Sequence, residues 1–220
     1  VKDSEGNSYI DAMGGLFLVN VGHGRSEIAE SVAEQLNSVH YANTFMYGTV
    51  PTILLAKKLA ELAPGDLNRV FLASGGSEAV DTALKIVRQY HVNNGEPRRT
   101  KFIARRGSYH GVSVGALSVN SSPAVHRDIW DPMLINTKFV GETAEEVEDL
   151  IKFEGPDTVA GFITEPISVP KGMVVPDDDY WPKLREICET EKVEVEEQAL
   201  VIIARLAMGG CVTPRAFSTR

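Results

Sequence analysis

Two patterns of apolar residues alternate along the chain, one typical of helices and the other of strands. In segment 26–38 an apolar residue returns every fourth position, at Ile28, Val32 and Leu36. This spacing places the three side chains on one face of an amphipathic helix, and Ser26 is a favourable residue to cap its start. Farther along, short apolar runs alternate with helical segments, which predicts a mainly parallel sheet with covering helices.

Further helices are predicted from the same spacing and from residues that begin or end helices. Pro51 favours the start of a helix over residues 52–62, which Pro64-Gly65 ends. Asp177 is expected to cap a helix that includes Trp181 and Pro182. The third helix spans residues 77–91, with Val80, Leu84 and Val87 on its buried face. Before all of these, residues 1–25 predict a short hairpin followed by a glycine-rich loop.

Three strand-like runs end in residues that can do chemistry. Ligands of open α/β sheets gather beyond the carboxyl ends of the strands, so these ends are the first place to look for a site. The three runs and the residues that follow them are Val70–Ala73 before Ser74-Gly-Gly-Ser77, Lys101–Arg105 before Gly107-Ser-Tyr-His-Gly111, and Val159–Thr164 before Glu165-Pro166.

The first of these ends has the features of an anion site. A helix that starts directly after a strand directs its N–H groups and the positive end of its dipole at one point, where phosphate is favoured. Gly75 and Gly76 let the backbone approach a bound group, and Ser77 can cap the helix or donate its hydroxyl hydrogen. The spacing matches neither of the two common nucleotide-binding loops. A plain structural turn with a serine cap explains the same residues.

Together these segments resemble the class III, pyridoxal-phosphate (PLP)-dependent aminotransferases of fold type I. The resemblance is greatest to the branch that pairs ω-amino acids such as β-alanine, or amines, with pyruvate. The segments that carry it run in order from the first residues to Cys188: Tyr9–Leu16, Val19–Gly22, Ala63–Phe71, Gly76–Ala79 with Asp81-Thr82, Tyr109–Gly111, Glu165-Pro166 and Tyr180–Cys188.

The resemblance implies an α/β fold with an incomplete, mainly parallel sheet and helices on both of its faces. It assigns residues 1–50 to an N-terminal part of the small domain and residues 51–188 to the PLP-binding large domain. Residues 189–220 then form a divergent tail. The first residue is Val1 and the match starts within a motif, so the chain is expected to be an internal part of a longer gene product.

The resemblance also assigns roles to five residues around the cofactor. Gly76 and Ser77 would cradle the phosphate, Tyr109 would stack on the ring with His110 beside it, and Glu165 would support the neighbourhood of the ring. Without the resemblance, Tyr109-His110 is a plain loop and Glu165 a solvent-facing strand end.

Two aromatic residues are candidates for the substrate pocket. Phe17 lies where ω-amino-acid enzymes often place a bulky aromatic side chain, and Phe45, followed by Met46, is a second candidate. Ordinary core packing is the alternative interpretation of Phe17. Sites of this family are shared between two chains, so the resemblance implies a homodimer that acts on a small amino donor and an oxo acid.

Composition and charge exclude some other classes of function. The net charge of −8 argues against a nucleic-acid-binding surface, and no apolar run reaches the roughly 18–20 residues that span a bilayer. Cys188 and Cys211 have neither metal-binding nor redox spacing, which favours reduced thiols in the cytoplasm. The remaining histidines, without metal-ligand spacing, are interpreted as structural: His23, His40, His91 and His126.

The motifs stop after Cys188. The family continues with a buried strand ending in Asp-Glu-Val, whose Asp contacts the pyridine nitrogen, and later with the Schiff-base lysine; neither is found here. The hypothesis is that residues 189–220 come from out-of-frame translation or an assembly artefact and that the chain as written is an inactive aminotransferase. Two alternatives remain open at this point: a non-catalytic module that binds a phosphate ligand or dimerises, and an unrelated α/β phosphate-binding protein.

Overall fold

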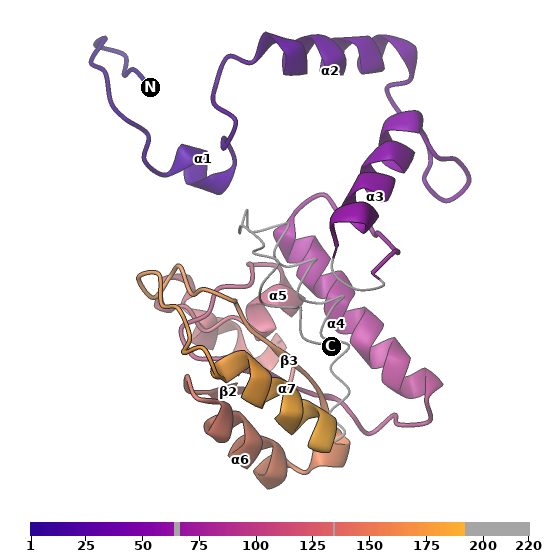
Figure 1. Ribbon diagram of the computed structural model, residues 1–220, viewed down its shortest axis with the longest axis vertical. Coiled ribbons are helices and arrows are strands. Elements are labelled where there is room, and N and C mark those ends of the chain that lie inside the picture. The colour runs from indigo at the N-terminus through magenta and orange to yellow at the C-terminus, as the bar shows by residue number, and fades with distance from the viewer. Residues whose placement is uncertain (64–66, 134, 192–220) are drawn as a thin grey trace. The chain divides into compact units, whose positions relative to one another are not determined.

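The computed structural model describes residues 1–63, 67–133 and 135–191 of the chain, excepting the side chains of Phe17 and Pro132 (Figure 1). Contacts between residues divide the described part into two compact units. The first comprises Val1–Ala63 together with Asn68–Val70, and the second comprises the other described residues. None of the described helices is both long enough and apolar enough to cross a lipid bilayer.

The first unit contains three helices and the predicted hairpin. An antiparallel bridge joins Lys2 to Ser8 around a turn at Gly6, whose φ of +88° suits glycine, so the hairpin is confirmed. The helices are α1 (Gly14–Phe17), α2 (Ser26–Ser38) and α3 (Val50–Leu62).

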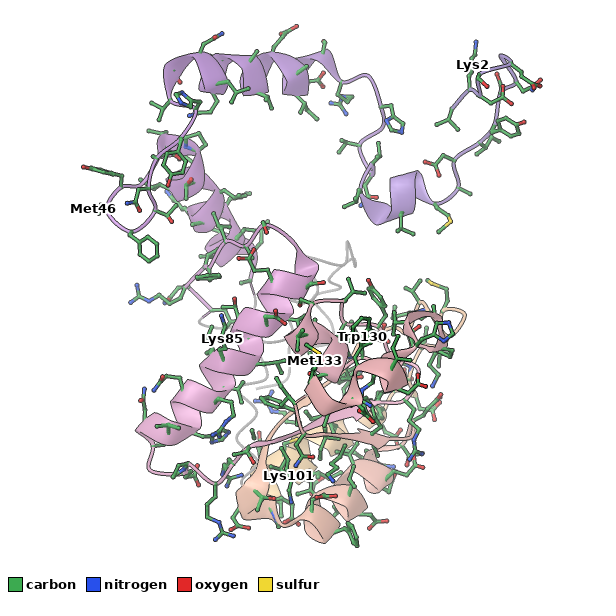
Figure 2. All side chains as sticks on the ribbon, turned by 180° about the vertical axis from the view of Figure 1, so that it is seen from behind. Lys2, Met46, Lys85, Lys101, Trp130 and Met133 are labelled. Carbon is green, nitrogen blue, oxygen red and sulfur yellow. The ribbon has the colours of Figure 1, made fainter. Side chains whose placement is uncertain are left out.

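Both longer helices of this unit were predicted, but their first residues differ from the prediction. Ser26 is the first helical residue of α2 rather than its cap, and Arg25 precedes it without a side-chain capping bond. Helix α3 begins at Val50, because the Thr49 hydroxyl accepts a hydrogen bond from the Thr52 amide and caps the helix before Pro51. Many apolar side chains of this unit are exposed, among them Met46 in the loop between α2 and α3 (Figure 2).

The prediction of a strand at Val70–Ala73 is wrong. This run forms no strand and belongs to no sheet among the described residues, and Phe71 and Leu72 are exposed. A strand exists only when its N–H and C=O groups pair with a neighbouring strand. Within the described residues no strand lies beside this run, so its apolar pattern does not produce one.

The second unit is built on a sheet of three parallel strands, β1 (Lys101–Arg105), β2 (Thr137–Val140) and β3 (Val159–Ile163). Their order is β2-β1-β3, with β1 hydrogen-bonded to both neighbours. The predicted strands 101–105 and 159–164 are confirmed, the second one residue shorter. Strand β2 was not predicted, since it is short and only its last residue is buried.

Helices cover both faces of this sheet, as predicted. On one face, α4 (Gly76–Asn93) and α5 (Val114–Ser118) pack against Phe102 and Ala104. On the other face, α6 (Ala144–Glu154) and α7 (Tyr180–Thr190) lie side by side and pack against Ile103 (Figure 1). Successive side chains of β1 therefore pack into the hydrophobic clusters on opposite faces of the sheet, because side chains alternate between the two faces along a strand. The described part of this unit also contains three short 3₁₀ segments, Pro123–Val125, Arg127–Met133 and Pro156–Thr158.

The observed ends of α4 and α7 can be compared with the ends that the sequence predicts. Helix α4 buries Val80, Leu84 and Val87, as predicted, but it runs from Gly76 to Asn93, one residue longer at its start and two longer at its end than the predicted helix 77–91. Helix α7 is preceded by Asp179, so the prediction that Asp177 caps it is wrong. Only the carbonyl oxygen of Asp177 takes part, accepting a hydrogen bond from the Tyr180 amide. Of the predicted tail 189–220, residues 192–220 lie outside the described residues.

Buried His91 has the structural role that the sequence indicated. Its Nε2 lies 2.8 Å from the carbonyl oxygen of Ala160 and its Nδ1 3.4 Å from a carboxylate oxygen of Glu96. The contact with Ala160 connects the C-terminal end of α4 to β3, and the contact with Glu96 connects it to the segment that follows the helix. His91 therefore fixes the C-terminal end of α4 against the sheet, at the opposite end of the helix from Gly76.

The capping box of α6 provides a test of the fold. Thr143 Oγ1 accepts from the Glu146 amide at 3.2 Å, and Glu146 Oε2 accepts from the Thr143 amide at 3.1 Å. We expect Thr143→Ala to lower the free energy of unfolding by about 1 kcal/mol in urea denaturation. The Glu146 amide loses its acceptor, and the Glu146 carboxylate loses the hydroxyl that helps to hold it beside the amide of residue 143. Thr143→Ser keeps the hydroxyl and should restore most of the loss. Equal losses in both variants would show that the box does not stabilise the unit.

Candidate functional site

The N-terminus of α4 and the loop that follows β1 meet in the second unit. Gly76 and Ser77 are the first two residues of α4, an 18-residue helix, and Gly75 precedes it with extended backbone. The Ser77 hydroxyl accepts a hydrogen bond from the Val112 amide at 3.0 Å. Ser77 therefore does not cap the helix. Its hydroxyl oxygen holds the loop, and its hydrogen can still be donated.

Gly111 shows how closely the two segments approach. Its φ is +125°, and a Cβ atom placed on it would lie 2.5 Å from Ser77 Oγ and 2.9 Å from Ala116 Cβ. No side chain fits there without movement. At Gly75, in contrast, a Cβ atom would meet nothing within 4 Å. The N-terminus of α4 is thus packed on the loop side and open at the residue before the helix.

Two acidic side chains shape this helix start. Glu78 accepts hydrogen bonds from the amide and the hydroxyl of Ser74 at 2.7 and 2.6 Å, and these bonds lower the pKa of its carboxyl group. Asp81 Oδ1 accepts from the Ala116 amide at 2.7 Å and so joins α4 to the start of α5. The sequence motif contained Asp81 without giving it a role. Its position one turn after Ser77, on the same helix face, was the available signal.

The loop after β1 carries the aromatic–imidazole pair. Tyr109 is half-buried, and its amide donates to Glu165 Oε1 at 3.2 Å. His110 is buried, and burial lowers its pKa to about 4 because the charged imidazolium loses its hydration. His110 Nε2 and Ser108 Oγ are both buried without a hydrogen-bond partner among the described residues.

Glu165 is buried at the end of β3 and connects two loops. One carboxylate oxygen accepts from the Tyr109 amide, and the other accepts from Ser168 Oγ at 2.7 Å. The alternative interpretation of Glu165 as a solvent-facing strand end is therefore wrong. Sequence reasoning missed Ser168, which lies three residues beyond Glu165 and satisfies its second oxygen.

The structure brings together five of the seven predicted site residues. Ser77, which follows Gly76 directly, contacts the loop of Tyr109 and His110, and the Tyr109 amide is bonded to Glu165. Phe45 lies in the first unit with its side chain almost fully exposed, and the side chain of Phe17 lies outside the described residues. The pocket roles of these two phenylalanines stay predictions.

These residues fit a phosphate-bearing aromatic ligand. The first N–H groups of a helix have no acceptor within the helix, and the space at Gly75 leaves them accessible to an anion. Tyr109, the nearby aromatic side chain, is held through its backbone rather than through its ring. Glu78 opposes an anion by its charge, although its carboxylate is already bonded to Ser74.

The burial of His110 gives a prediction for pH. The unfolded side chain takes up a proton near its ordinary pKa of 6.5, whereas the folded one does so only near 4. Between these values the unfolded state binds more protons, so stability falls as the pH falls. Between pH 7 and 5 we expect the chain to lose about 2 kcal/mol more than His110→Gln in urea denaturation. Parallel pH profiles for the two proteins would contradict the buried neutral imidazole.

Comparisons with known proteins agree with this arrangement. A sequence-family model for class-III aminotransferases matches residues 1–219, so it also covers the segment after Cys188 in which the motifs alone carry no resemblance. The probable aminotransferase Rv3329 of Mycobacterium tuberculosis is 40% identical over 207 residues, which cover 86% of this chain and 44% of that protein. Putrescine–pyruvate aminotransferase of Pseudomonas aeruginosa is 38% identical over 205 residues, covering 85% and 45%.

A solved structure gives the same result for the fold. The ω-transaminase of Pseudomonas jessenii in complex with PMP superimposes with a TM-score of 0.79 at 32% identity, covering 88% of this chain and 47% of that one. The fold is therefore the α/β fold of PLP-dependent transaminases, as predicted. The chain spans about half the length of the curated relatives that it matches.

Proposed function

Since the chain belongs to the class-III aminotransferase family, we propose that it serves PLP-dependent transfer of an amino group from an ω-amino acid or amine to pyruvate or a similar oxo acid. Enzymes of this family use PLP, and PMP is its aminated form. The observation that carries the proposal is the junction of Ser77 with the loop of Tyr109, where an anion site and an aromatic side chain share one edge of the sheet.

The N-terminal turn of α4 would bind the cofactor's phosphate. The amides of Gly76 and Ser77 point out of the helix start, the helix dipole favours negative charge there, and the Ser77 hydroxyl has a hydrogen to donate. Each charge-assisted hydrogen bond of this kind is worth about 1.5–3 kcal/mol. The carboxylate of Glu78 reduces this gain.

Tyr109 would stack on the cofactor ring, and Glu165 would keep Tyr109 in position. Stacking of two aromatic rings adds about 0.5–1.5 kcal/mol beyond the burial of their surface. Because Glu165 is bonded to the Tyr109 backbone and to Ser168, we give it a positioning role rather than direct contact with the ring. His110, neutral at physiological pH, would keep its Nε2 available to a neutral or acidic partner.

These 220 residues would bind the cofactor without turning substrate over. When bound, PLP supplies the aldehyde that receives the amino group and a ring that withdraws electrons. The reaction also needs a lysine that bonds to the aldehyde and moves a proton, and an acid beside the ring nitrogen. The lysines of the sequence, including Lys85, Lys101 and Lys171, lie outside the family's motif for that residue.

The other parts of the chain have proposed roles of their own. Residues 1–50 would belong to the small domain and residues 51–188 to the large, PLP-binding domain, with residues 189–220 a divergent tail. Phe17 and Phe45 would line the substrate side of the site. We propose a homodimer in the cytoplasm, supported by the family's shared sites and by cysteines without disulfide or metal spacing.

A second candidate function follows from the same lysine argument. A chain that keeps the phosphate and ring contacts without the lysine can act as a non-catalytic module that binds phosphate ligands or dimerises. For these 220 residues both candidates predict that PLP or PMP is held reversibly, and exchange of amino groups between the bound cofactor and a donor would contradict both.

Cofactor affinity tests the phosphate and ring contacts. We expect PLP to quench the intrinsic fluorescence of the chain, and Ser77→Ala to weaken binding about tenfold or more, because it removes a donor to the phosphate. Tyr109→Ala should weaken binding about two- to tenfold, while Tyr109→Phe, which keeps the ring, should not. Ser31→Ala in α2 is a matched control. Equal affinity in Ser77→Ala, Tyr109→Ala and the control would refute the proposed site.

Borohydride trapping tests the lysine argument. We expect mass spectrometry of the chain, after incubation with PLP and borohydride, to find no adduct concentrated on a single lysine. Adducts spread over exposed lysines at low occupancy agree with this expectation. A stoichiometric adduct on one lysine would contradict it and would identify the residue that bonds to the cofactor.

A further inference from the structure

Three loops leave the carboxyl edge of the sheet, one after each strand. The first contains Gly107 and Tyr109, the second contains Glu142, and the third contains Glu165 and Lys171. The bond from the Tyr109 amide to Glu165 ties the first loop to the third. A second connection, which passes over Gly107, ties the third loop to the second. Its residues have no role in the proposed function.

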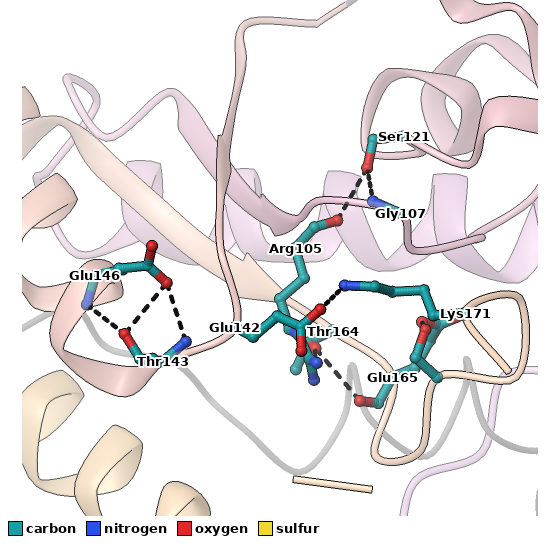
Figure 3. Close-up of polar contacts among 10 residues, drawn as sticks. Arg105, Gly107, Ser121, Glu142, Thr143, Glu146, Thr164, Glu165 and Lys171 are labelled. Carbon is teal, nitrogen blue, oxygen red and sulfur yellow. Dashed lines mark hydrogen bonds and ion pairs between the residues drawn. The ribbon is translucent and has the colours of Figure 1, made fainter. Parts of the chain in front are cut away.

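Lys171 forms this second connection. Its Nζ donates to Glu142 Oε1 in an ion pair that joins the loop after β3 to the loop after β2 (Figure 3). The Lys171 side chain is 22% exposed, well below the cations of the ordinary surface pairs of this chain, such as Lys183 at 48%. A lysine this buried is packed along most of its length.

The stem of Lys171 lies across Gly107. A Cβ atom placed on Gly107 would lie 2.9 Å from Lys171 Cδ and 3.1 Å from Cγ, and the φ of Gly107 is +80°. Glycine is therefore needed at this position both for the backbone conformation and for the passage of the lysine stem. All three loops are in contact at this point.

A buried arginine, Arg105, also interacts electrostatically with the carboxylate of this ion pair. Arg105, the last residue of β1, is buried, and its Nη1 donates to Thr164 Oγ1 at 3.5 Å. The hydrogen bond from Lys171, and then the charges of Lys171 and Arg105, lower the pKa of the Glu142 carboxyl group. Glu142 therefore balances two cations, and one of them is inside the unit.

The first loop is also fixed at its start. Ser121 Oγ accepts from the Gly107 amide at 2.8 Å and donates to the Arg105 carbonyl oxygen at 3.0 Å (Figure 3). Tyr109 thus lies two residues after Gly107, which is bonded to Ser121 and covered by the stem of Lys171. The Tyr109 amide itself is bonded to Glu165. How far Tyr109 can still move therefore depends on whether the three loops move together.

We propose that Lys171 and Glu142 form a latch across Gly107 that positions Tyr109 for a bound aromatic ligand. The part of this inference that concerns the ligand rests on the proposed function. Lys171 and Glu142 are positioning residues, because they act through Gly107 and touch no group that we assign to the ligand. The latch sets how far the Tyr109 loop opens.

Hydrogen–deuterium exchange of the peptide that covers residues 106–112 measures this opening without any ligand. In Lys171→Met and in Glu142→Gln we expect exchange to become about two- to fivefold faster, the effect expected from a solvent-accessible ion pair. The double variant should be no faster than either single variant, because one connection is lost in all three. Lys171→Arg should restore slow exchange, and salt should reduce the difference between wild type and Lys171→Met.

Lys183→Met is the matched control. Lys183 bridges α7 to Glu145 of α6 at 3.1 Å and also pairs with Asp179, the residue directly before α7, at 2.8 Å; among the described residues it forms no ion pair with Glu142 or with the loop that contains Tyr109. It should leave the exchange of residues 106–112 unchanged. Exchange in Lys171→Met equal to that in Lys183→Met would overturn the latch, as would additive effects in the double variant.

PLP affinity of the same variants tests the positioning role. We expect Lys171→Met to bind PLP about two- to fivefold more weakly than wild type and Lys171→Arg to bind normally. Faster exchange with unchanged affinity would overturn positioning while leaving the connection itself in place. If wild type binds no PLP, the proposed function fails, and the exchange measurements still decide whether the latch exists.

Discussion

The parallel alignment of β1, β2 and β3 is the constraint on which the described site depends. Strands that run the same way need crossover connections. Here the connection from β1 to β2 carries α5 on one face of the sheet, beside α4, and the connection from β2 to β3 carries α6 on the other face, beside α7. All five residues of β3 are buried as a result. The same alignment puts the three strand ends at one edge, so residues from segments more than fifty positions apart meet there.

Several polar side chains are buried at this edge, among them Arg105, His110 and Glu165. Glu165 has both carboxylate oxygens bonded, whereas Arg105 Nε and His110 Nε2 have no partner among the described residues. An unpaired buried polar atom costs free energy, and natural proteins tend to keep such atoms where they serve function. The edge is therefore a place where a ligand can supply hydrogen bonds that the described residues lack.

Family membership and geometry contribute different information about this edge. Geometry provides an anion-attracting helix start, an aromatic loop and a carboxylate that holds the loop. Many phosphate ligands would suit such an arrangement. The class-III aminotransferase match narrows the ligand to PLP and excludes the earlier alternative of an unrelated phosphate-binding protein. The latch of Lys171 and Glu142 comes from geometry, since no sequence motif pointed to either residue.

The sequence by itself determined the elements whose pattern is local. The apolar spacing of α4 and the apolar runs of β1 and β3 were sufficient to predict these elements. The order of the motifs carried the family resemblance, which assigned the five residues around Ser77 and Tyr109 the roles that we propose. Tertiary structure decided what depends on distant partners. Val70–Ala73 has the composition of a strand but finds no strand to pair with among the described residues, and Asp81 and Lys171 gained roles from contacts with residues about thirty positions away. Side-chain hydrogen bonds between loops leave no periodic trace in a sequence, because their spacing is set by the fold and not by the repeat of a helix or strand.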